Sequence, residues 1–190
     1  MEKYMIILVA VLMTISAYGQ EEGTVDVKTT KKLTREQRLE QRREKEEATA
    51  KMVDWLIENR QFVLKARFLS NQSGERIPVN DDLNFIIIDS TEITIQIAST
   101  TGIGGSNGMG GITASGSISL FDVQRIGRNK ESYNIRILAM TSIGSYDIFL
   151  SVSPTSNTDA SISGTTRGRL NYHGVIVPVK GSRIYKGMSI

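Results

Sequence analysis

From residue 61 to the C-terminus, apolar side chains occupy every second position in short runs that turn residues interrupt. Residues 133–139 and 148–152 are the clearest of these runs. Successive side chains of a strand point to opposite faces, so a period of two is typical of half-buried strands. Short strands separated by turn signals predict an antiparallel β-sandwich or a small barrel, and the pattern leaves these two open. Strand-helix-strand alternation is missing, which argues against a parallel α/β fold.

The same alternation gives the order of the expected strands. We expect a loop over residues 71–82, where Gly, Pro, Asn and Asp gather, and a hairpin turn at 89–91. Gly116 is expected to mark a bulge or bend in its strand. Residues 183–186 are expected to form a short final edge strand. The other expected strands cover residues 62–68, 83–88, 93–98, 112–124, 133–139, 148–152, 160–162 and 170–178.

One N-terminal α-helix precedes the β segments, over residues 34–59. Thr34 followed by Gln37 fits the capping box, in which two side chains satisfy the first free amides of a helix. The first half of the helix is almost wholly charged and should face water. The second half has an apolar face, which we expect to pack on the sheet, with binding to a partner as the alternative. This face consists of Met52, Val53, Leu56 and Ile57.

Residues 1–19 have the features of a secretory signal peptide. Lys3 precedes an apolar run over residues 5–15, and small residues stand at Ala17 and Gly19. A membrane anchor needs about 20 apolar residues, so this run favours cleavage after Gly19. We therefore expect a periplasmic or secreted protein without a stable membrane span after cleavage. A polar linker over residues 20–33 would join the signal peptide to the helix, and residues 60–190 would form the β domain.

Composition excludes several kinds of chemistry. The chain contains no cysteine, which removes thiol nucleophiles, disulfides and zinc–thiolate sites. Its formal net charge is +3, and basic residues are interleaved with acidic ones. Nucleic-acid binding is not expected from such a distribution. We expect no cofactor and no metal, since His173 is the only histidine and no calcium-loop spacing is present. His173 itself is expected to be a solvated or hydrogen-bonded structural residue.

A glycine-rich stretch over residues 101–113 separates two strongly alternating segments. It lacks the third glycine of a dinucleotide fingerprint and the lysine of a phosphate-binding P-loop. Residues 104–108 do match Gly-x-Ser-x-Gly around Ser106, and three aspartates precede His173 in the chain. These aspartates are Asp122, Asp147 and Asp159. A serine hydrolase of this kind needs a strand-to-helix turn at the serine, whereas a strand is expected next. We therefore expect no catalytic residue and no enzyme.

Five distinctive segments occur in order along the chain: 84–89 (NFIIID), 107–113 (NGMGGIT), 140–144 (MTSIG), 172–178 (YHGVIVP) and 184–190 (IYKGMSI). Together they resemble segments of a domain-of-unknown-function family of small exported proteins from Gram-negative gut-type bacteria. The resemblance extends over about residues 48–190. It implies a mostly β domain with an N-terminal helix, and it brings no assigned activity, ligand or catalytic residue.

The predicted function is therefore a non-catalytic binding module for a small or apolar ligand. Small barrels and sandwiches bind ligands at an open end or between sheets. In this hypothesis the glycine-rich stretch acts as a flap over that mouth, through Asn107, Gly108, Gly110 and Gly111. The alternative is a structural or protein-interaction component of the cell envelope. Most aromatic residues lie on the apolar parity and are expected to fill the core, with Tyr146 and Tyr185 as exceptions.

Overall fold

The computed structural model describes residues 34–71, 73–98, 111–128, 131–164 and 169–187. The predicted signal peptide (1–19) and linker (20–33) lie outside these residues and stay predictions. The chain divides into two units, residues 1–39 and 40–190. The second unit begins inside the predicted helix, so the latter half of that helix belongs to the same unit as the strands.

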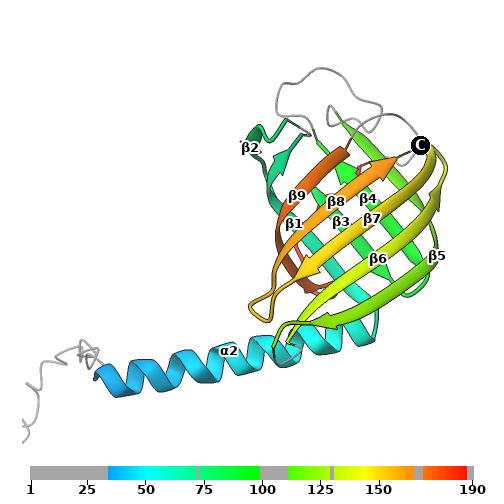
Figure 1. Ribbon diagram of the computed structural model, residues 1–190. Coiled ribbons are helices and arrows are strands. Elements are labelled where there is room, and N and C mark those ends of the chain that lie inside the picture. The colour runs from blue at the N-terminus through cyan, green and yellow to red at the C-terminus, as the bar shows by residue number, and fades with distance from the viewer. Residues whose placement is uncertain (1–33, 72, 99–110, 129–130, 165–168, 188–190) are drawn as a thin grey trace, which may run out of the picture. The chain divides into compact units, whose positions relative to one another are not determined.

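Eight antiparallel strands close into a barrel in the order β1-β3-β4-β5-β6-β7-β8-β9, and β9 pairs back onto β1 (Figure 1). This pairing decides between the two predicted architectures in favour of the barrel. The short strand β2 pairs with the end of β1 outside the ring. The strands are β1 (Gln61–Ser70), β2 (Arg76–Pro78), β3 (Phe85–Asp89), β4 (Glu92–Ile97), β5 (Ile112–Ile126), β6 (Ser132–Thr141), β7 (Gly144–Val152), β8 (Asn157–Gly164) and β9 (Arg169–Pro178).

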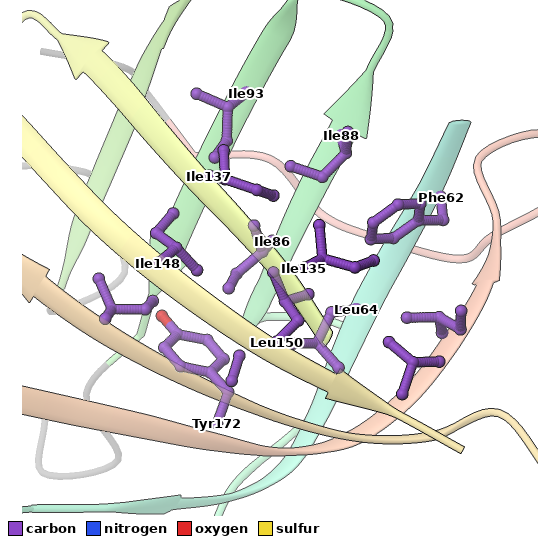
Figure 2. Close-up of a cluster of buried hydrophobic side chains, with 14 of the residues drawn as sticks. Phe62, Leu64, Ile86, Ile88, Ile93, Ile135, Ile137, Ile148, Leu150 and Tyr172 are labelled. Carbon is purple, nitrogen blue, oxygen red and sulfur yellow. The ribbon is translucent and has the colours of Figure 1, made fainter. Parts of the chain in front are cut away.

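The barrel interior is filled by apolar side chains that alternate along the strands, as Figure 2 shows. An eight-stranded barrel has an interior just wide enough for side chains to fill. Tyr172 is fully buried there, and its hydroxyl donates to the backbone carbonyl of Gln96 at 3.1 Å. The largest fully buried side chains of the described residues are Leu56, Phe62, Leu64, Phe85, Ile86, Ile88, Ile93, Tyr133, Ile135, Ile137, Ile148 and Tyr172.

The helix α2 (Arg35–Glu58) begins with the predicted capping box. The Thr34 amide donates to the Gln37 side chain at 3.1 Å, and the Gln37 amide donates back to the Thr34 hydroxyl at 3.4 Å. The apolar side chains Val53, Leu56 and Ile57 are buried within the same core cluster as the strands. The expected packing of the helix on the sheet is thus confirmed. Within the described residues, no helix combines the length and the apolar content that crossing a membrane requires.

Three local expectations were wrong. Residues 183–186 form no strand; instead residues 182–187 are irregular and are tied to β4 through the Gln96 side chain. Within the expected loop at 71–82, β2 forms a three-residue ladder with β1. The irregularity of β5 lies between Ile118 and Leu120 and not at Gly116. Gly116 instead allows close strand approach, since a Cβ there would lie 2.0 Å from the carbonyl oxygen of Met140.

A buried tyrosine connects α2 to β6 and predicts an alkaline destabilisation. The Tyr133 hydroxyl donates to Asp54 Oδ1 at 2.6 Å. Burial, followed by this hydrogen bond, raises the pKa of Tyr133 from 10.0 to about 12. Between these pH values the unfolded chain loses the proton while the folded protein keeps it, so the free energy of unfolding should fall. Urea unfolding from pH 9 to 12 should show a smaller fall for Tyr133→Phe than for the wild type.

Tyr172, whose pKa burial also raises, is present in both proteins and contributes equally to both curves. The comparison therefore isolates Tyr133. Parallel curves for the two proteins over this pH range would contradict the prediction.

Candidate functional site

Two adjoining grooves lie on the outer wall of the barrel. The first, which we call the Phe149 groove, has a volume of about 570 Å³ and crosses strands β5 to β9. This volume is within the range of ligand pockets in proteins, roughly 300–1,000 Å³. The side chains that line it point outward because the opposite parity of each strand fills the interior. They include Gln124, Asn134, Arg136, Phe149, Ser161 and Asn171.

Phe149 is an aromatic side chain on the outward face of β7, and it is 50% exposed. The guanidinium of Arg136 lies 5.2 Å from the centre of its ring. Arg136 is held in turn by two hydrogen bonds to Asp147, from Nε at 3.2 Å and from Nη2 at 2.9 Å. These bonds raise the pKa of the guanidinium. An ordered cation beside an exposed ring gives the groove a defined aromatic contact point for a ligand.

The second groove, the arginine groove, has a volume of about 440 Å³. It shares three lining residues with the Phe149 groove, namely Ser151, Asp159 and His173. The two grooves are therefore neighbours on one continuous surface. Other residues that line the arginine groove are Arg67, Phe68, Arg76, Ser132, Ser153 and Asn157.

A chain of hydrogen bonds orients His173 where the grooves meet. Asn171 Nδ2 donates to Ser70 Oγ at 3.4 Å, and Ser70 Oγ lies 2.9 Å from His173 Nε2. His173 Nδ1 lies 2.6 Å from Asp159 Oδ1. An amide nitrogen only donates and a carboxylate only accepts, so Asn171 donates to Ser70 and His173 Nδ1 donates to Asp159. Both ring nitrogens are thereby engaged, as expected for a hydrogen-bonded structural histidine.

The strand register explains why these four side chains meet. Asp159 and His173 are direct partners between β8 and β9, and Ser70 is the partner of Asn171 between β1 and β9. Partners in register point to the same side of a sheet, here the outer one. In the sequence, Asp159 was only one of three aspartates that precede His173, and no sequence feature indicated Ser70.

The atoms of Ser70, His173 and Asp159 follow the order of a catalytic triad, but their exposure is the reverse of what catalysis needs. A nucleophilic serine must be accessible and its aspartate buried. Ser70 is 7% exposed and lines neither groove, whereas the Asp159 side chain is 73% exposed. In a serine hydrolase, a backbone amide beside the serine donates to the oxyanion. Here the amide of Asn71, next to Ser70, already donates to the carbonyl of Glu75 at 3.2 Å. The arrangement is suited to fixing the imidazole and not to acyl transfer.

The predicted flap falls mostly outside the described residues. Asn107, Gly108 and Gly110, together with Ser106, lie outside the described residues, and their proposed roles stay predictions. Gly111 is described and stands beside the end of β4, where a Cβ would lie 1.8 Å from the carbonyl oxygen of Ile97. Only glycine fits so close to a neighbouring backbone.

The remaining predicted residues fall in different places. Asp147 binds Arg136, and Asp122 lines the Phe149 groove. Of the two aromatic exceptions, Tyr185 is exposed and Tyr146 is partly buried against the core. Phe149 was not predicted as a site residue. The apolar alternation of its neighbours Ile148 and Leu150, which point inward, could have placed Phe149 on the outer face. In the part of the chain that the structure describes, no three metal-ligating side chains gather.

Closed walls, a filled interior and two outward grooves of ligand size define a small β-barrel protein. Comparison with protein families then identifies it: the chain belongs to the domain of unknown function family DUF4251, whose model matches residues 41–176. The predicted resemblance to a family of unknown function is thus confirmed.

A solved structure supports the fold. It is the 1.95 Å crystal structure of a DUF4251 family protein from Bacteroides eggerthii, which matches with a TM-score of 0.61 and 23% identity. The match covers 72% of this chain and 91% of that one. No curated protein matches the chain significantly.

Proposed function

We propose that this chain is an exported, non-catalytic binding module whose small ligand lies in the Phe149 groove. The carrying observation is the half-exposed Phe149 ring within a groove of about 570 Å³. An apolar part of the ligand would contact this ring, and its polar groups would meet amides and hydroxyls of the groove. Large exposed aromatic side chains mark binding sites more often than single exposed aliphatic ones do.

Two features favour binding over catalysis. The interior is occupied by side chains, so the ligand-sized spaces described above lie on the outer wall. The only serine that is hydrogen-bonded to His173 in the described part of the chain is the buried Ser70. Export itself rests on the predicted signal peptide, and an N-terminus at Gln20 in the mature protein is the expected result.

Native mass spectrometry tests the binding proposal. The protein purified from its native source should carry extra mass that disappears on denaturation, and Phe149→Ser should remove this mass. The physical reason is the loss of the aromatic contact, while the outward position of Phe149 leaves the core intact. Tyr185→Ser, which changes another exposed aromatic residue, is the matched control and should keep the extra mass. A bare wild-type chain, or equal loss in both variants, would contradict the proposal.

An interaction component of the cell envelope is the second candidate, and the exposed Trp55 favours it. Trp55 is 52% exposed on α2, although its neighbours Leu56 and Ile57 are buried. A tryptophan left on the surface is a frequent anchor in protein interfaces. In this case Trp55→Ser should abolish crosslinking to an envelope partner, whereas Phe149→Ser should leave it unchanged. The opposite pattern would exclude the helix as the contact.

A further inference from the structure

We propose that the arginine groove is an anion-binding site that takes a phosphate, sulfate or carboxylate group. This inference deepens the proposed function, because the groove adjoins the Phe149 groove and one ligand can extend over both. It assigns a negative charge to that ligand. Arg67 and Arg76 both line this groove, and few carboxylates surround them.

A β-bulge presents Arg67. In the ladder between β1 and β9, Ala66 is the partner of Gly174 and Phe68 is the partner of His173, so Arg67 is the extra residue. Bulges aim a side chain away from the regular alternation and often occur beside functional sites. Arg67 is exposed and lines the groove, while its carbonyl accepts a hydrogen bond from the Val79 amide at 3.0 Å. This bond holds the backbone at Arg67, while its neighbours Ala66 and Phe68 are paired with β9.

Arg76 is held in place by an aromatic ring. It lies on β2 opposite Ser70, and its guanidinium stands 4.1 Å from the centre of the Phe68 ring. Stacking on a ring occupies one face of a guanidinium and leaves its edge, which carries the N–H donors, free for a ligand. A guanidinium that is already ordered loses less entropy when it binds.

The groove has an excess of positive charge. Among the described residues, neither Arg67 nor Arg76 has a carboxylate within 4.0 Å. Asp159 is the only acidic residue that lines the groove, and it is engaged by His173 Nδ1 at 2.6 Å. By contrast, Arg125 and Arg136 on β5 and β6 each pair with an acid.

Planar guanidinium groups recognise planar or tetrahedral oxyanions through paired N–H donors. Ser132 and Asn157, which also line the groove, offer further uncharged donors. Charge and donors together point to an anionic group, while Asp159 at the rim would disfavour dense polyanions. The site is thus suited to a single anionic group of a small molecule.

Titration of the full-length protein with inorganic phosphate, inorganic sulfate and acetate tests this inference. Arginine Nε–H resonances of Arg67 and Arg76 would be followed by NMR, at constant ionic strength. At least one of the three anions should shift them saturably, with a dissociation constant on the order of millimolar, as expected for a small ion on a surface site. The anion that binds most tightly would identify the chemical source of the charge.

Matched variants locate the effect. Arg67→Gln combined with Arg76→Gln should weaken binding at least tenfold, while Arg42→Gln combined with Arg43→Gln, two exposed arginines of α2, should change it less than twofold. Arg76→Lys keeps the charge but loses the planar fork, so it should bind several-fold more weakly than the wild type. This conservative variant keeps the test valid if the double variant folds poorly.

Absence of a saturable shift with all three anions would overturn the inference. Equal weakening by the two double variants would also overturn it, because the effect would then be diffuse charge. Phe149→Ser should retain the affinity for the free anion. Failure of anion binding in a protein that still loses its native ligand on Phe149→Ser would reject this inference alone and leave the proposed function standing.

Discussion

Replacing Gln96 by leucine should destabilise the protein by about 2–4 kcal/mol, because a buried side chain that makes four hydrogen bonds would lose all of them. Its Nε2 donates to the carbonyls of Leu83 at 3.0 Å and Tyr185 at 2.8 Å. Its Oε1 accepts from the Thr113 hydroxyl at 3.0 Å and the Gly187 amide at 2.8 Å. Urea unfolding gives the free energy, and amide exchange of residues 182–187 should become faster.

Gln124→Leu is the matched control for this change. Gln124 lies on the exposed outward face of β5, so its replacement should alter the free energy of unfolding by no more than about 0.5 kcal/mol. If Gln96→Leu changed the free energy of unfolding no more than this control does, residues 182–187 would be held by contacts other than the Gln96 side-chain amide.

Leu56→Ala should lower the free energy of unfolding by about 2–5 kcal/mol, which is the second large expected effect. Leu56 is completely buried in the cluster that joins α2 to the barrel, and truncation would leave a cavity between helix and strands. Chemical denaturation would measure the loss, together with the far-ultraviolet circular dichroism of the remaining helix.

Leu39→Ala makes the same chemical change at a leucine of the same helix that is 50% exposed. It should stay within about 0.5 kcal/mol of the wild type. If both variants lost the same free energy, helix propensity and not packing would explain the effect, and the docking of α2 would contribute little stability.

Local alternation was sufficient to predict the eight strands of the barrel but not their closure. In a run such as residues 133–139, every second side chain is apolar, so neighbouring residues alone show which side of the strand faces the core. The choice between barrel and sandwich depends on whether β9 returns to β1, and no local pattern carries that pairing. Residues 183–186 were mistaken for a strand, because the hydrogen bonds of this irregular segment go to the side chain of Gln96 and not to a ladder.

The candidate site was less predictable than the fold. The outward position of Phe149 followed from the parity of β7, yet its neighbour Arg136 comes from another strand and depends on register. Similarly, Arg67 reaches the arginine groove through a bulge that shifts the pairing by one residue. Such shifts arise from the fit of two whole strands, so the sequence around Arg67 gives no sign of them.

Closure of the ring through β1 and β9 has a consequence for how the chain folds. The Ser70–His173 hydrogen bond joins residues 103 positions apart, and the whole β1–β9 ladder lies at similar separations. Contacts so distant along the chain form slowly, because a long loop must close before they stabilise anything. The ring therefore cannot close until β9, the last of its strands in the chain, is available to pair with β1.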